Sequence, residues 1–275
     1  MHIREYSLPA GWFPRDCGAV SAFLSKFSVN KGFSRAAIAP HAGWYYCGNL
    51  AARAVSALQP EAETVVVLGG HLSSASASLF AMEDAVKTPF GNMPIDKALR
   101  SALLKELNGA EDRYRDNTIE VLLPMVHHYF PKANLLWLRL PADLNSFEAG
   151  KKISAAAANI NRKINVLAST DLTHYGSNYD FSPHGAGREA LNWVRYVNDA
   201  NFIKAVESAN PDEALLCAER DHAACSAGAV LGVMGFAEAE GLGSARLLEY
   251  GTSADVNQDE EPESFVGYAA FSFGG

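Results

Sequence analysis

The 275-residue sequence lacks any run of about 18 consecutive apolar residues, which is the length that a membrane-spanning helix requires. Its first residues, MHIREYSLPAGWFP, carry charge and an early proline and lack the apolar core of a signal peptide. There are only 4 cysteines, and none of them forms a C-x-x-C pair. These absences predict a cytoplasmic protein without a membrane partner, whose cysteines remain thiols available for metal or redox chemistry.

The sequence also lacks a cluster of basic residues longer than two. The formal net charge is -8, and the acidic residues are scattered along the chain. Because nucleic-acid phosphates are bound by basic patches, we expect no nucleic-acid partner. No G-x-G-x-x-G opens a helix and no Walker pattern occurs, so neither of these phosphate-binding loops is predicted.

The sequence does contain short apolar runs that alternate with helical patterns. The runs typical of buried strands cover residues 35–40, 64–70, 134–140, 163–170 and 245–251, and an alternating aromatic run covers 264–273. Apolar residues at helical spacing cover 48–59, 96–107, 146–160, 187–208 and 225–241. The polar segment 256–263 is expected to be an exposed loop. This alternation predicts one α/β domain over residues 1–275, with a central mixed β-sheet flanked by helices on both faces.

Reactive side chains follow several of the predicted strands or begin a predicted helix. They are His41, His71, the pair Asp171 and His174, Cys225, and Asp255. In open α/β sheets, functional residues collect where strand carboxyl ends meet helix amino termini. Imidazoles, thiols and carboxylates are ligands that divalent iron, copper or zinc accept. The joint placement therefore predicts a metal site whose ligands are distant in sequence, which suits a catalytic site more than a structural one.

Taken singly, the same residues have ordinary structural interpretations. A histidine after a strand is usually a hydrogen-bonded turn residue, and Cys225 alone is usually a small buried hydrophobe. Asp171 suits a helix or turn cap, and Asp255 a loop carboxylate. Glu120 lies in an apolar stretch and needs a partner, so it either supports the site or faces water. Only the joint placement favours the metal site.

Seven segments of the chain resemble the Memo-like protein family. In order, they are LPAGWFP, IAPHAGWYYCG, VVVLGGH, IEVLLP, STDLTHYG, ACSAG and SFVGYAAF, and they extend over nearly the whole chain. The family includes protein B of the bacterial AmmeMemoRadiSam system and is similar in fold to the LigB-type (class III) extradiol dioxygenases, which are non-haem Fe(II) enzymes. The resemblance implies a LigB-like fold and a metal pocket formed by two histidines and a cysteine, which match His41, His71 and Cys225.

The resemblance also implies an acid–base pair. Asp171 and His174 match the family's S-D-x-x-H segment, and the equivalent histidine of the related dioxygenases acts as acid or base beside the metal. The chain departs from the family pattern at three points. Its LGGH is one residue shorter than the frequent LGPxH before His71, Asn117 replaces a common histidine, and Ser226 replaces a glycine.

A cysteine ligand would replace the carboxylate of the dioxygenase facial triad. A thiolate is softer and oxidisable, which argues against simple catechol cleavage. Our first hypothesis is a metal-binding protein, with Fe(II) as the expected metal and copper or zinc as alternatives, that performs redox or oxygen-dependent chemistry on an unidentified small substrate. His174, oriented by Asp171, is its predicted acid–base residue.

Two other hypotheses use the same residues. In one, the protein is a peptide- or protein-binding module without turnover, and Trp44, Tyr45 and Tyr46 line its groove unless they only pack the following helix. The name of the bacterial relatives then implies radical-SAM and AMMECR-type partner proteins. In the other, Cys225 at a helix amino terminus is a nucleophile with a lowered pKa and a histidine as base.

Overall fold

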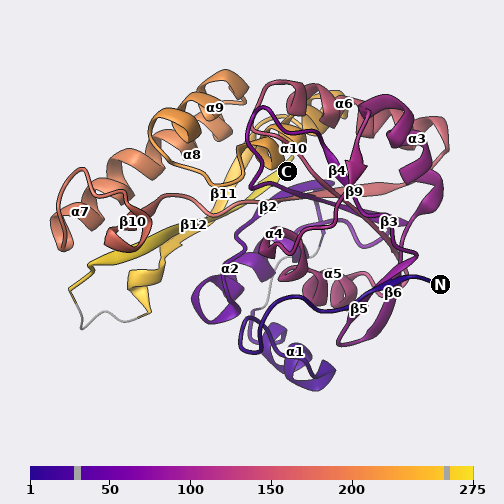
Figure 1. Ribbon diagram of the computed structural model, residues 1–275, viewed down its shortest axis with the longest axis horizontal. Coiled ribbons are helices and arrows are strands. Elements are labelled where there is room, and N and C mark those ends of the chain that lie inside the picture. Colours follow the sequence, from indigo (N-terminus) through magenta and orange to yellow (C-terminus); the bar gives the residue numbers. More distant parts are fainter. Residues whose placement is uncertain (28–31, 257–260, 275) are drawn as a thin grey trace.

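The computed structural model describes residues 1–27, 32–256 and 261–274 of the chain. Within these ranges one large sheet contains nine strands, with helices above and below it (Figure 1). The strands are β2 (Ala36–Ala39), β3 (Thr64–Gly69), β4 (Leu79–Phe80), β7 (Ala110–Glu111), β8 (Asn134–Arg139), β9 (Ile164–Ser169), β10 (His174–Gly176), β11 (Ala245–Thr252) and β12 (Ser264–Phe273). Their order is β10-β12-β2-β9-β3-β8-β4-β7, and β11 also pairs with β12.

The centre of the sheet is parallel. Neighbouring strands β2, β9, β3 and β8 all run in the same direction, so their carboxyl ends share one edge. All residues of β2, β3 and β9 are buried, because helices cover both faces, and this explains their continuous apolar sequences. Strand β12 runs antiparallel to β2, β10 and β11, and β4 runs antiparallel to β8. The predicted mixed sheet is confirmed.

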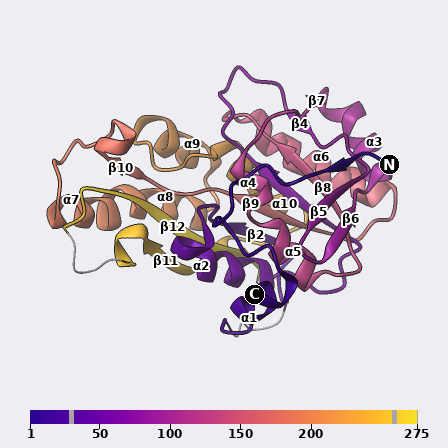
Figure 2. The ribbon, with the colours of Figure 1, turned by 60° about the horizontal axis from the view of Figure 1, so that its bottom comes forward.

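Helices cover both faces of the sheet, as Figures 1 and 2 show. One layer contains α3 (Lys97–Leu107), α6 (Asn145–Asn159), α8 (Asp199–Glu207), α9 (Pro211–Arg220) and α10 (Ala227–Ala239). The other contains α1 (Cys17–Leu24), α2 (Trp44–Ser56), α4 (Asn117–Glu120) and α5 (Leu123–Tyr129). Helix α10 packs against α6 and the parallel strands and is buried over most of its length. A side chain at Gly150 of α6 would collide with the Gly232 carbonyl of α10, so glycine is needed for this close packing.

A smaller sheet lies beside the main one in Figure 2, near the chain's first residues. Its strands are β1 (Ile3–Arg4), β5 (Ala85–Thr88) and β6 (Gly91–Pro94). Strand β1 is parallel to β5, and β5 is antiparallel to β6. This sheet attaches the first residues of the chain to the segment between β4 and α3.

The six predicted strands are all present, and their ends differ from the predictions by one residue at most. Helix α2 begins at Trp44 rather than residue 48, directly after Gly43. The predicted helix 187–208 consists of α7 (Arg188–Trp193), a π-helical turn (Val194–Asn198) and α8. Of the predicted loop 256–263, residues 257–260 lie outside the described residues. Within the described ranges, the helices lack the length and apolar character needed to cross a bilayer.

Candidate metal centre

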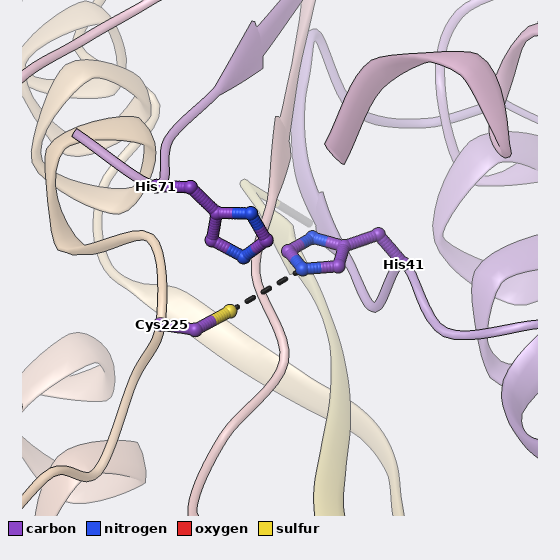
Figure 3. A group of neighbouring side chains, drawn as sticks. All are labelled: His41, His71 and Cys225. Atoms are coloured by element: carbon purple, nitrogen blue, oxygen red, sulfur yellow. Dashed lines mark hydrogen bonds between the residues drawn. The ribbon is translucent and has the colours of Figure 1, made fainter. Parts of the chain in front are cut away.

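The structure brings together three of the predicted residues at the carboxyl edge of the parallel strands. His41 follows β2, His71 follows β3, and Cys225 precedes α10 (Figure 3). One ligand atom from each residue lies within 4.8 Å of the other two. Cys225 Sγ lies 3.3 Å from His41 Nε2, and the two imidazole rings are nearly perpendicular, with centroids 5.0 Å apart. We call these three residues the His/His/Cys cluster.

The approach of β3 to α10 depends on Gly70. A Cβ atom at this position would lie 2.6 Å from Ser226 Oγ and 2.7 Å from Ser226 Cα, which is too close for any real side chain. The next residue, His71, has a φ of 56°, in the left-handed region that non-glycine residues rarely adopt. The sharp turn directs the His71 ring toward Cys225 (Figure 3).

Three hydrogen-bonding contacts fix His41, which is buried. Its Nδ1 lies 2.9 Å from Ser169 Oγ, so Nε2 is left facing the cluster. Its backbone N–H donates to Asp171 Oδ1 at 2.7 Å. Its carbonyl accepts from Asn117 Nδ2 at 3.1 Å, which gives a role to the residue that replaces the family's common histidine.

His71 is fixed by a carboxylate that the sequence analysis missed. His71 Nδ1 lies 2.9 Å from Asp116 Oδ2, and Arg139 Nη2 donates to the same oxygen at 3.3 Å. Asp116 also accepts from the Thr118 N–H at 2.9 Å, as the N-cap of α4. Both histidines therefore present Nε2 to the cluster while a neighbouring side chain holds Nδ1, as metal-ligating histidines do.

The surroundings of the Cys225 sulfur favour its ionised form, the thiolate. Burial opposes its ionisation, but the nearby His41 charge and hydrogen bonds with His41 and His71 hold the pKa of the Cys225 thiol well below its usual value. The backbone fixes its place, because Asp171 N–H donates to Sγ at 3.3 Å and Cys225 N–H donates to the Asp171 carbonyl at 3.2 Å. A thiolate is the form of cysteine that binds metals and attacks electrophiles.

Asp171 and His174 lie beside the cluster. Asp171 Oδ2 is 3.9 Å from Nε2 of both His41 and His174. Burial disfavours the charged carboxylate, but the His41 charge and hydrogen bonds from His174 and the His41 backbone lower the pKa of Asp171 overall. Burial lowers the pKa of His174, but the contact with Asp171 and the negative charges of Cys225 and Asp171 together outweigh this and raise the pKa. The His174 side chain is 34% exposed, so a proton on its ring can exchange with a ligand or solvent.

Asp255 and Glu120 contact other groups. Asp255 pairs with Arg195 and accepts from the Thr252 N–H at 2.7 Å, so it caps a short helical turn. Glu120 accepts from the Ser7 N–H at 2.8 Å and lies 3.5 Å from Arg15 Nη1, so it anchors the first residues of the chain. The loop interpretation fits Asp255. Glu120 fits neither of its expected roles, because its side chain is 13% exposed and its partners are residues near the start of the chain.

The three aromatic residues after His41 separate into two environments. Trp44 is buried, donates from Nε1 to the Val121 carbonyl at 2.9 Å, and packs on Phe23. It is a core residue. Tyr45 and Tyr46 are 67% and 46% exposed, so they are available to contact a ligand.

Fold and site together define an α/β protein with histidine and cysteine side chains converging at the ends of parallel strands. The family model described as "Memo-like protein" matches residues 4–272, and the chain belongs to this family. The family prediction is thereby confirmed.

Two archaeal relatives match most of the chain. A MEMO1 family protein of Pyrococcus horikoshii is 28% identical over 290 residues, which cover 98% of each chain. Another, from Methanopyrus kandleri, is 29% identical over 250 residues, covering 86% of this chain and 82% of the relative. The crystal structure of an uncharacterized protein from Escherichia coli K12 shares the fold, with a TM-score of 0.52 and 15% identity over 87% of this chain and 99% of that one.

Proposed function

We propose that the protein binds one metal ion through His41 Nε2, His71 Nε2 and Cys225 Sγ, with Fe(II) as the first choice and copper or zinc as alternatives. The observation that carries this proposal is the convergence of the three donor atoms within 4.8 Å. Two imidazoles and a thiolate are donors that these metals share. The low pKa of Cys225 supports it further, because a cysteine ligand is deprotonated.

One pair of donors, Cys225 and His41, also has the spacing that a shared ion requires. Bonds of about 2.3 Å to sulfur and about 2.0 Å to nitrogen, at a tetrahedral angle, separate the two donors by roughly 3.5 Å. The observed distance of 3.3 Å between Cys225 Sγ and His41 Nε2 is close to that value. Three protein donors leave coordination positions open, which suits a catalytic centre better than a structural one.

We propose redox or oxygen-dependent chemistry on a small substrate as the activity of this centre. When bound, the metal supplies a Lewis acid and, if it is iron or copper, a site for electron transfer. His174 donates or accepts the proton at Nε2, because its ring is partly exposed at the edge of the cluster. Asp171 orients His174 and favours its protonated form, since the charged carboxylate beside it raises the pKa of the ring.

Metal analysis of anaerobically purified protein tests this proposal. We expect about one equivalent of iron, copper or zinc in the parent protein, after reconstitution if necessary. The Cys225→Ser variant and the double variant His41→Ala, His71→Ala should lose it. His128→Ala is the matched control, because this histidine packs on Phe90 and Tyr129. Equal metal in the parent and the double variant would refute the assignment.

The 3.3 Å contact between Cys225 Sγ and His41 Nε2 also favours a second candidate, a cysteine nucleophile. Its test is alkylation by iodoacetamide at neutral pH, in which the sulfur displaces iodide. If the metal proposal holds, bound metal protects Cys225 from alkylation and a chelator removes the protection. Rapid alkylation at full metal occupancy would favour the nucleophile instead.

A further inference from the structure

A cavity of about 570 Å³ lies among residues of α2, β12 and the segment that follows β10. This volume is within the usual range of about 300–1,000 Å³ for small-molecule sites. Its walls include Tyr46, Tyr179, Tyr268, Glu261 and Glu263. By contrast, the pocket that contains Asp116, behind His71, has room for about 20 Å³, which is the space of a single water. Of these two spaces, only the one of about 570 Å³ can admit an organic molecule.

Two residues that line the cavity are neighbours of the proposed acid–base residue. The His174 ring lies against Tyr179, with the ring centroids 5.0 Å apart. In the pairing of β10 with β12, His174 is opposite Val266, which lines the cavity, as does Tyr268 two residues further along β12. His174 is therefore a neighbour of two lining residues, Tyr179 and Val266, rather than a lining residue itself.

The walls of the cavity carry negative charge and aromatic rings. Glu261 and Glu263 are lining residues, and no lysine or arginine is among the described residues that form the walls. Glu261 lies 3.6 Å from Arg188, and both of these side chains are exposed. Tyr46 and Tyr179 are 46% and 42% exposed, so part of each side chain is open to a ligand. Carboxylates and tyrosine rings both attract cations, the rings through their quadrupole.

The negative charge of these walls is specific to this cavity and does not simply follow from the net negative charge of the chain. A second cavity, of about 440 Å³, is lined by Arg35, Arg162 and Lys163 with one carboxylate, Glu61. Two cavities of similar size in one protein therefore carry opposite charge. The acidic cavity is the one whose lining includes neighbours of His174.

We propose that the acidic cavity is the substrate site of the metal centre and that it selects a small organic cation, an amine attached to an apolar or aromatic body. The tyrosine rings contact the apolar body and the cationic amine of the ligand, and the Glu263 carboxylate faces the charge of that amine. This inference rests on the proposed function, because it assigns the substrate class of that centre.

Binding of three matched probes to the full-length, chelator-treated protein tests the cavity by itself. Benzylamine is a cation at neutral pH, benzoate is an anion of similar shape, and benzyl alcohol is neutral. We expect titration calorimetry to detect benzylamine binding and much weaker binding of the other two. Glu263→Gln should weaken benzylamine binding by about two- to fivefold, the effect of one exposed charge pair. Tyr179→Ala should weaken it by a similar factor through loss of a cation–π contact.

The control variant is Glu61→Gln, in the basic cavity, which should bind benzylamine like the parent protein. Three results would overturn the proposal: no benzylamine binding, binding of benzoate or benzyl alcohol with equal affinity, or an unchanged affinity in Glu263→Gln. Because metal is absent from this measurement, its outcome is independent of whether the His/His/Cys cluster binds metal.

A second measurement connects the cavity to the centre. In protein loaded with Co(II), saturating benzylamine should shift the visible absorption of the metal, and benzoate should not. If benzylamine binds without any shift, the cavity is not the substrate site of the centre, even though it binds cations. If Co(II) does not load, the proposed function fails, and the inference that rests on it fails as well.

Discussion

His71 Nδ1 lies 2.9 Å from Asp116 Oδ2, and Arg139 Nη2 lies 3.3 Å from the same oxygen. Arg139 is buried, and its Nε donates to the carbonyl of Gly70, the residue before His71, at 2.9 Å. The ring of His71 and the backbone that carries it are thus held by one ion-pair network. This network identifies Asp116 as a positioning residue for the proposed metal ligand.

Replacing Asp116 with asparagine should weaken metal binding while the fold is retained. The amide removes the charge that fixes the His71 ring, and loss of such a partner typically costs about 10–100-fold in metal affinity. Competition with a chromogenic zinc chelator measures the effect. Glu111→Gln, on an exposed carboxylate paired with Arg113, is the control. Equal zinc affinity in Asp116→Asn and the parent protein would show that Asp116 has no such role.

Replacing His174 with glutamine should leave metal content unchanged. Its Nε2 lies near the carboxylate of Asp171, and His174 is outside the His/His/Cys cluster. The metal content of His174→Gln is compared with that of the double variant His41→Ala, His71→Ala. Loss of an acid–base residue leaves the metal in place, whereas loss of a ligand removes it. Loss of metal from His174→Gln to the level of the double variant would make His174 a ligand.

Gly70→Ala should destabilise the protein by about 1–3 kcal/mol, the cost of overpacking a tight site. The new methyl group would collide with Ser226 at the start of α10. Ser226→Gly in the same chain should restore part of the loss, because it removes Oγ and Cβ but leaves Cα, which is 2.7 Å from the added carbon. Urea unfolding of the parent, both single variants and the double variant measures the coupling. Additive effects would contradict the proposed contact.

Asp199 should make stability depend on pH between about 4 and 6. It is buried, and burial raises the pKa of its carboxyl from 3.8 to about 6, despite hydrogen bonds from Thr173 and Tyr250. The folded state therefore binds a proton that the unfolded state has released. The stabilisation is fully present below pH 4 and is lost as the pH rises through 6, by up to about 3 kcal/mol.

The asparagine variant of Asp199 isolates this effect. Asp199→Asn should lose the decrease in unfolding free energy between pH 4 and pH 6, measured by urea unfolding of chelator-treated protein. Asp212→Asn, at an exposed position, should keep it. If the parent and Asp199→Asn show the same pH profile, the Asp199 carboxyl does not titrate in this range.

The central strands could be predicted because helices bury them on both faces, which requires continuous apolar sequences such as TVVVLG in β3. The two-residue strands β4 and β7 are too short to show any period. Helix α9 was not predicted, although Asn210 and Pro211 are typical of a helix start. The break in the predicted helix 187–208 has a tertiary cause, because the π-helical turn directs Asn198 to Thr173 Oγ1, at 2.9 Å.

The candidate site was predictable where its residues follow long strands. His41, His71, Asp171 and His174 were found by this rule, and Cys225 by its place at a predicted helix start. The family resemblance added the role expected of each residue. Asp116 could not be found in this way, because it caps a helix of four residues that shows no apolar period. The cavity could not be predicted from the sequence either, since Tyr179 and Glu263 become neighbours only through the pairing of β10 with β12.

The parallel arrangement has a consequence for biosynthesis. His41 and His71 leave the ribosome early, but Cys225 is synthesised more than 150 residues after His71, and β12, which pairs with β2, follows later still. No short nascent segment contains all three donors. The complete set can form only when most of the polypeptide has been translated and folded, so the proposed metal could be bound only at a late stage of the protein's maturation.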